Sequence, residues 1–245
     1  MKEYELVFFE NFNNLNCWNY EHGFVRNKEL QYYTNNNIVL ENGIKIIAQK
    51  EKVKNENYIP NNDDWRKGRE YANYTSSSIN TFEHFSFQYG IMEVKAKIPT
   101  SKSAWPAIWL LGDDEGWPHG DEIDIMEFYL IKNVPSILCN FMYYNIDHED
   151  WNSKVIDLDY FLKKDANWTD KFHIWKLDWT DKYMKVYIDD ELINSIEIDK
   201  IPGNKFKRKY YILLNLAIGR NEITPDDDEF PMEYNIEYVK VWQKK

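Results

Sequence analysis

Six residues near the middle of the chain, Glu122-Ile123-Asp124-Ile125-Met126-Glu127, place three carboxylates among three bulky apolar side chains. On a helix, at about 100° per residue, the acids would spread over roughly 200° and share no face. On a strand, Glu122 and Asp124 lie on one face and the isoleucines on the other, but Glu127 falls on the wrong side by one residue. A β-bulge at Met126 adds one residue and restores it. The segment therefore predicts a bulged strand with its acids along one surface.

Such a row of acids favours one kind of chemistry. Burying apolar side chains beside carboxylates is costly unless the acids have partners or a chemical role. Two long Glu side chains that lean toward each other over a shorter Asp suit glycoside hydrolysis, because a retaining mechanism needs carboxyl groups about 5–5.5 Å apart. The alternative is an amphipathic strand whose acids only face solvent.

Alternation with a period of two dominates the rest of the chain. Residues 92–98 alternate apolar with charged side chains, as a half-buried antiparallel strand does. Only nine glycines and eight prolines occur, and no internal repeat or linker-like run divides the sequence. A length of 245 residues fits one large all-β domain, so we expect residues 1–245 to form a single catalytic domain.

Composition limits the partners. The formal net charge is −11, and the nearest approach to a basic cluster is the short run at residues 205–209, so we expect no nucleic-acid partner. A neutral polysaccharide is compatible with this charge, and a polyanionic glycan is less so. Aromatic residues make up 17% of the chain, which suggests a groove lined by flat rings that pack on sugar faces.

Cysteine, histidine and hydropathy patterns exclude several other classes. Cys17 and Cys139 form neither a disulfide framework nor a metal-binding pattern, and whether they pair stays open. The five histidines lack metal-ligand spacing, and we expect a structural role for His173. No stretch approaches the roughly 20 apolar residues of a membrane helix. The first residues carry no signal-peptide pattern, which leaves an intracellular protein or a removed signal as alternatives.

The acid segment resembles the active-site signature of glycoside hydrolase family 16, the laminarinase and β-glucanase group. Similar motifs follow in the family's order: Asn27-Lys28-Glu29-Leu30-Gln31-Tyr32-Tyr33, Trp105-Pro106-Ala107-Ile108-Trp109 and Leu214-Asn215-Leu216-Ala217-Ile218-Gly219. The resemblance runs from about residue 5 to residue 242. It implies an all-β, concanavalin A-like β-sandwich jelly roll with a concave substrate cleft, which agrees with the alternating pattern.

The resemblance also implies roles for individual residues. Glu122 is expected to be the nucleophile, Asp124 to assist it, and Glu127 to be the acid/base. The residues expected to bind substrate are Trp105, Trp109, Trp117, Asn27 and Asn140.

Three positions depart from the family pattern. Asp121 stands where a Gly usually precedes the first Glu, Asn140 where many members carry His, and Arg220 where a second Gly is usual. An extra carboxylate at Asp121 would raise proton affinity nearby unless it points away from the other acids. With Arg220 at this position, the sequence does not determine the shape of that end of the cleft.

Relatives often hold a structural calcium ion, for which the matching positions are Asn11, Gly43 and Glu237. Two of the usual acids are altered there, and calcium prefers hard oxygen ligands. We therefore expect that no cofactor is required, and a structural calcium ion stays an alternative.

The leading interpretation is a retaining endo-β-glycosidase that cuts a β-1,3- or mixed β-1,3/1,4-glucan by a two-glutamate double displacement. The alternatives are a hydrolase of a galactan of the agarose, carrageenan or porphyran type, or a non-hydrolytic glycan-binding module on the same fold. Transglycosylation would use the same residues. We expect a monomer with a polysaccharide as its partner, located outside the cell as the family implies, with the cytoplasm as the alternative.

Overall fold

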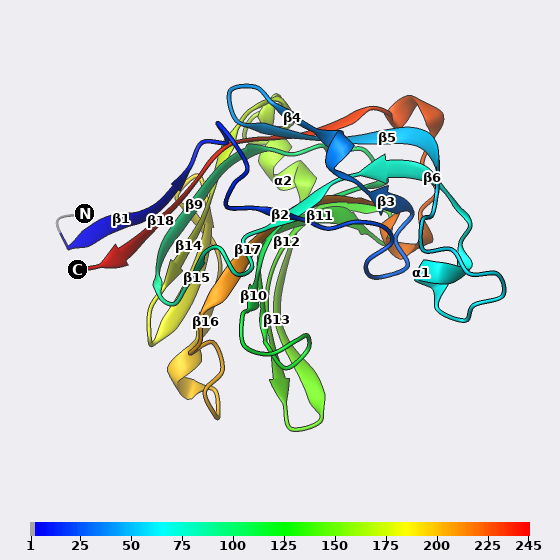
Figure 1. The fold of residues 1–245 in the computed structure, drawn as a ribbon. Helices are drawn as coiled ribbons and strands as arrows, with labels where there is room; N and C mark the ends of the chain where they lie inside the picture. The colour runs from blue at the N-terminus through cyan, green and yellow to red at the C-terminus, as the bar shows by residue number, and fades with distance from the viewer. Residues whose placement is uncertain (1–2) are drawn as a thin grey trace.

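The computed structural model describes residues 3–245, which form two β-sheets packed face to face (Figure 1). Nearly all strand pairs are antiparallel; the pairing of β3 with β6 is parallel. The predicted all-β sandwich is therefore confirmed. Both chain ends lie together, because β1 pairs along β18 (Figure 1).

The outer sheet has ten strands. Their order is β16 (Glu191–Glu197), β15 (Tyr183–Ile188), β14 (His173–Trp179), β9 (Gly90–Lys97), β18 (Met232–Lys244), β5 (Ile44–Lys54), β6 (Tyr71–Ser76) and β3 (Gln31–Tyr33), with β1 (Tyr4–Glu10) beside β18 and β4 (Ile38–Leu40) beside β5.

The second sheet has eight strands and carries the predicted acids. Its order is β13 (His148–Asp157), β12 (Val134–Asn145), β11 (Glu122–Ile131), β10 (Ala104–Gly112), β17 (Tyr210–Ile218), β7 (Ser78–Asn80) and β2 (Asn19–Tyr20), with β8 (Ser86–Phe87) beside β17.

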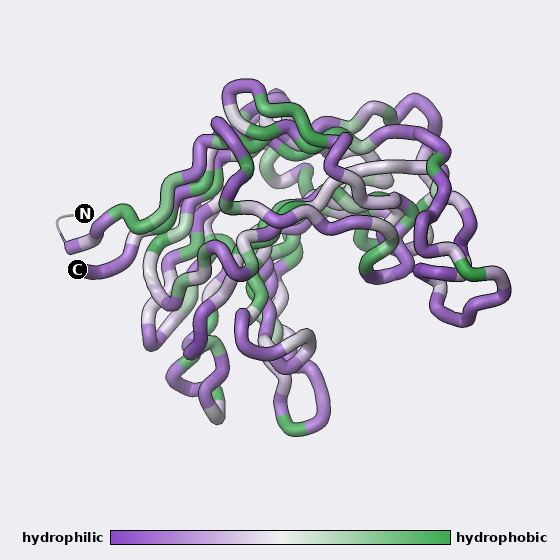
Figure 2. The backbone as a smooth tube through the Cα atoms, in the orientation of Figure 1, coloured by the Kyte–Doolittle hydropathy of each residue, from purple (hydrophilic) through white to green (hydrophobic). Residues whose placement is uncertain are grey.

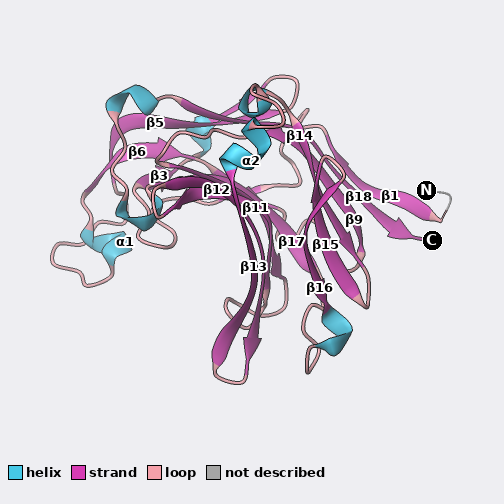
Figure 3. Cartoon of the chain, turned by 180° about the vertical axis from the view of Figure 1, so that it is seen from behind, coloured by secondary structure: helices cyan, strands magenta, loops and turns pink. Residues whose placement is uncertain are grey.

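Short helices connect the strands near the ends of the sheets (Figure 3). They are α1 (Trp65–Gly68), α2 (Leu158–Leu162) and the 3-10 turns η1 (Asn35–Asn37), η2 (Trp168–Asp170), η3 (Ile198–Lys200), η4 (Arg220–Glu222) and η5 (Asp227–Glu229). Among residues 3–245, no helix has both the length and the apolar character that crossing a membrane demands.

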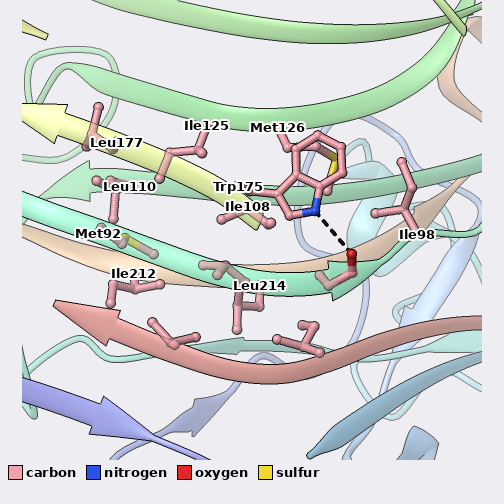
Figure 4. Packing of buried hydrophobic residues seen from close by; sticks show 14 of the residues in the cluster. Met92, Ile98, Ile108, Leu110, Ile125, Met126, Trp175, Leu177, Ile212 and Leu214 are labelled. Carbon is pink, nitrogen blue, oxygen red and sulfur yellow. Dashed lines mark hydrogen bonds between the residues drawn. The ribbon is translucent and has the colours of Figure 1, made fainter. Parts of the chain in front are cut away.

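The core lies between the two sheets, where one side of each strand is apolar. The predicted alternation in β9 is confirmed, because Met92, Val94 and Ala96 are fully buried in this core. Trp175 lies among them, and its indole N–H donates to the Ala96 carbonyl at 3.3 Å (Figure 4). Burying one side chain of this kind contributes roughly 2–3 kcal/mol. The loops at the strand ends are largely hydrophilic, as Figure 2 shows.

The segment 144–170 shows no regular apolar alternation in the sequence, yet it contains a strand as well as a short helix. It holds the whole of β13, which pairs with β12 over ten residues, and then α2. The sequence pattern does not reveal this strand, because β13 is at the edge of its sheet and most of its side chains are polar and exposed. This hairpin extends the second sheet beyond the acids (Figure 1).

Candidate active site

The strand β11 carries the acids on one face through the predicted bulge. Asp124 pairs with Asn140 of β12 and Glu127 pairs with Leu138, so two residues of β11 oppose one residue of β12 between them. The bulge therefore covers Ile125 and Met126, as predicted. Both of these side chains are fully buried in the core, while the acids before and after them share the opposite face.

The three acids lie within one hydrogen-bonded group. Asp124 is within hydrogen-bonding reach of both Glu122 and Glu127. The Glu122 carboxylate accepts the indole N–H of Trp117 at 2.9 Å, and the Glu127 carboxylate accepts that of Trp105 at 2.9 Å. After burial, the charges of Glu127 and Glu122 also act to raise the pKa of Asp124, so the close approach of the three carboxyl groups favours a proton on the group.

Burial and mutual repulsion explain why the acids hold protons. Removal from water, with the nearby charge of Glu127, raises the pKa of Glu122 to about 7. Burial also raises the pKa of Asp124 and that of Glu127. Carboxyl groups that titrate near neutral pH are suited to donating and accepting protons in a reaction.

A cleft of about 360 Å³ opens above the acids. The three acids line it together with four of the five residues predicted to bind substrate, namely Trp105, Trp109, Trp117 and Asn27. It is also lined by Arg26, Glu29, Ala107, Leu111 and Asn215, which the sequence had not assigned.

The three tryptophans differ in how they face the cleft. Trp105 and Trp109 are only 7% and 8% exposed, so they are walls of the cleft rather than open platforms. Trp109 is held by its indole N–H, which donates to Asn215 Oδ1 at 2.8 Å. Trp117 is 55% exposed and leans from the loop between β10 and β11 onto Glu122.

Asn140 lies under the acids rather than in the cleft lining. Its side-chain amide donates to Asp124 Oδ2 at 3.1 Å and to Glu127 Oε2 at 2.9 Å. The amide thereby ties the two carboxylates together from the neighbouring strand. Its carbonyl oxygen is buried and has no hydrogen-bond partner among the described residues.

A half-buried arginine lies at one end of the cleft. The Arg26 guanidinium pairs with Glu21 and stacks over the ring of Trp109 at 5.1 Å. Its positive charge acts to lower the pKa of Glu122, against the larger effect of burial. Glu29 beside it is buried, and it accepts hydrogen bonds from Asn27 at 3.3 Å and Gln31 at 2.6 Å.

A second arginine lies at the other end. The Arg220 guanidinium stacks 4.4 Å from the ring of Trp105 and 5.3 Å from that of Tyr129. Its positive charge acts to lower the pKa of Glu127. The departure from the family pattern at this position therefore places a cation beside the predicted acid/base.

Asp121 points away from the other acids, which is the second of the two orientations considered for it from the sequence. Its carboxylate is fully buried and accepts the backbone N–H of Tyr144 at 3.3 Å and that of Phe206 at 3.2 Å. The Tyr210 hydroxyl donates to it at 3.3 Å, and Arg208 Nε lies 3.9 Å away. Asp121 therefore joins the loop before β11 to the segment before β17.

The histidine and cysteines take no part in this site. His173 is buried and stacked on Trp168, and its ring nitrogens contact the Trp168 carbonyl and Asp189, so its predicted structural role is confirmed. Cys17 is exposed and Cys139 is buried, and the two do not form a disulfide.

The residues considered for calcium do lie together. Asn11, Gly43 and Glu237 line one surface hollow of about 660 Å³. The Glu237 carboxylate is engaged by Lys95 Nζ at 2.7 Å, however, and calcium takes six to eight oxygen ligands, several of them usually carboxylates. Within residues 3–245, no group of three or more His, Cys, Asp or Glu is placed to hold a metal ion. This donor set does not fit a calcium ion.

Removing divalent cations with EDTA is therefore expected to leave the melting temperature unchanged, within about 1 °C. An ion that binds only the folded chain would stabilise it by an amount that grows with the logarithm of the ion concentration above its Kd, so its removal would lower Tm. Thermal unfolding in EDTA and in millimolar calcium checks this. A rise of several degrees in calcium that Glu237→Gln abolishes would assign the ion to this hollow.

Comparisons with known proteins agree with the site. The family model described as "Glycosyl hydrolases family 16" matches residues 26–238. Glucan endo-1,3-beta-glucosidase A1 of Niallia circulans is 26% identical over 255 residues, which cover 93% of this chain and 36% of that protein. The chain thus spans about a third of that relative's length.

Two solved structures resemble the whole chain. The laminarinase catalytic domain of Thermotoga maritima superposes with a TM-score of 0.82 at 27% identity, and covers 99% of both chains. A chain from work on endo-acting O-glycanases, which prominent members of the human gut microbiota express to initiate mucin breakdown, has a TM-score of 0.88 at 31% identity. That match covers 99% of this chain and 92% of the other.

Proposed function

This chain belongs to glycosyl hydrolase family 16, and from that membership we propose that it cuts a β-1,3- or mixed β-1,3/1,4-glucan internally, with retention at the anomeric carbon. The observation that carries the proposal is the group of three carboxyls on β11, in which Asp124 lies between Glu122 and Glu127 at the base of an aromatic cleft. The glucanase and laminarinase names of the relatives support the choice of glucan.

In the first step, a Glu122 oxygen attacks the anomeric carbon and the glycosidic C–O bond breaks. Glu127 donates its proton to the departing oxygen, which leaves a glycosyl-enzyme ester on Glu122. The indole N–H of Trp117 orients the attacking carboxylate, and Asp124 lies within hydrogen-bonding reach of the same carboxylate.

In the second step, the Glu127 carboxylate takes a proton from water as the water oxygen attacks the anomeric carbon. The ester bond to Glu122 breaks, and the sugar is released with its original configuration. Trp105 and Asn140 each donate to Glu127, so the same carboxyl group stays in position for both proton transfers.

A panel of polysaccharides tests the proposed substrate. Reducing sugar is expected from laminarin and lichenan, and none from agarose or carrageenan. NMR of the first product is expected to show the β anomer. Release of reducing sugar from agarose or carrageenan alone would contradict the glucan assignment.

A second candidate is an endo-acting hydrolase of mucin O-glycans. The observation that favours it is the TM-score of 0.88 with the O-glycanase-related structure, against 0.82 with the Thermotoga maritima laminarinase domain. Mucin O-glycans therefore belong in the same panel, and release from them without release from laminarin would replace the glucan by this substrate.

Replacing Arg220 by Gln is expected to shift the alkaline limb of the pH–kcat profile upward by roughly 0.5–1 pH unit. The limb is set by loss of the Glu127 proton, and removing the nearby cation raises the pKa of that carboxyl. Arg220→Lys keeps the charge, so its profile is expected to match the wild type.

The other groups that face Glu127 are unchanged in these variants. On the same strand these are Glu122, Asp124 and Tyr129, and the thiol of Cys139 lies behind them in the core. Burial raises the pKa of all four. A shift of equal size in Arg220→Lys would mean that the stacking of Arg220 on Trp105, and not its charge, sets the limb.

A further inference from the structure

The cleft described above occupies only one side of the catalytic strand. Its lining comes from β10, β11, β17, the segment at residues 26–29 and the loop with Trp117. An enzyme that cuts inside a polymer must hold sugar units on both sides of the bond that breaks. The remaining sugar units of the polymer must therefore lie over β12 and β13, on the same face of the sheet.

Strand register identifies which side chains share that face. Glu122 pairs with Met142 of β12, and Met142 pairs with Trp151 of β13. Asn140, two residues before Met142, points to the acids, so Met142 and Trp151 also lie on the acid face. Two strand spacings, about 9–10 Å, separate Trp151 from Glu122, which is the length of one or two sugar units.

Trp151 is exposed to solvent, whereas the residue beside it on β12 is buried. Its side chain is 47% exposed, whereas Met142 between it and Glu122 is fully buried. Val155, four residues along β13 on the same face, is exposed as well. Single exposed apolar residues need no explanation, but an exposed indole in register with a catalytic carboxyl offers a flat apolar surface where the substrate must pass.

We propose that Trp151 is the sugar-stacking platform for the half of the substrate that lies beyond β12, and that it selects neutral sugars there. This inference rests on the proposed function. The selection follows from the charge of the hairpin that carries Trp151, which holds Asp147, Glu149 and Asp150. Glu149 lies on the same face as Trp151, two residues before it on β13. Within residues 3–245, the ion pairs of these three acids are those of His148 with Asp147 and Asp150. Sulfated or carboxylated sugars would meet like charge at this position.

The test compares binding of short and long β-1,3-gluco-oligosaccharides to Glu122→Gln, which cannot turn them over. Calorimetry with a trisaccharide and a hexasaccharide measures how much affinity the longer chain gains. Adding Trp151→Ala is expected to remove about tenfold of the hexasaccharide affinity and to change trisaccharide affinity less than about twofold. Adding Trp151→Phe is expected to retain most of the gain.

A matched control is Phe172→Ala, which removes an exposed aromatic side chain beside β14 in the other sheet. It is expected to change neither affinity. The platform is wrong if Trp151→Ala lowers both affinities equally or neither, or if a sulfated hexasaccharide binds as tightly as the neutral one. Failure of the wild-type chain to release sugar from laminarin, with the length-dependent binding intact, would instead overturn the hydrolytic function alone.

Discussion

Replacing Glu122 with Gln is expected to lower kcat on laminarin by about a thousandfold or more. The amide keeps the size of the side chain but cannot form the glycosyl ester, so no intermediate accumulates. Initial rates of reducing-sugar release measure the loss, and mass spectrometry of the rapidly quenched protein detects the intermediate in the wild type.

The matched control for this variant is Glu93→Gln, the same change on a half-buried strand position of the other sheet. It is expected to turn over at the wild-type rate. Near-wild-type turnover by Glu122→Gln would remove Glu122 from the nucleophile's role and leave the two-glutamate mechanism without its first step.

The same variant is expected to be more stable than the wild type above neutral pH. Burial raises the pKa of Glu122 to about 7 from its ordinary value of 4.5, so the folded chain binds this proton more tightly than the unfolded chain does. Stability from this group is present below about pH 4.5 and is lost as pH rises through about 7. Melting curves across this range are expected to fall more steeply for the wild type than for Glu122→Gln.

Replacing Glu127 with Gln is expected to lower kcat on laminarin by roughly 10²–10⁴-fold, because the departing oxygen then receives no proton. A dinitrophenyl glycoside of a short glucan needs no such proton, since its phenolate leaves readily. Formation of the glycosyl ester from it is expected within about tenfold of the wild-type rate.

This difference between substrates separates an acid catalyst from a structural carboxylate. Ester hydrolysis in the second step also needs Glu127 as base, so the dinitrophenyl glycoside is expected to give a burst of phenolate followed by slow turnover. Equal losses on both substrates, without a burst, would contradict the acid/base assignment. Circular dichroism and Tm of the variant show whether its fold is retained.

The acid strand and its bulge could be predicted because the relevant information is local. Glu122, Asp124 and Glu127 share a face only if one residue is added between the last two, and the apolar residues between them require a core on the other side. The same reasoning applies to β9, where every second side chain is buried. The Asn-Gly pair at residues 42–43 is likewise a local signal, typical of a tight turn, and a side chain at Gly43 would lie 2.3 Å from the Ile236 carbonyl oxygen.

The rest of the site depends on which strands become neighbours, and this is not written in any short segment. Arg26 comes to lie beside Trp109 and Asn215 only through pairing and packing of elements far apart in the chain. Trp151 faces the acid side only because β13 pairs with β12 in one register. A shift of one residue would turn it to the other face.

The bulge at Ile125 and Met126 has a consequence for how such a site tolerates a deletion. Without Met126 the segment would alternate regularly, and Glu127 would still face the cleft, as would the strand residues after it. One codon can therefore be lost here without turning an acid into the core. What changes is the distance along the strand between Glu122 and Glu127. The bulge therefore sets the spacing of the two carboxyl groups that the reaction uses.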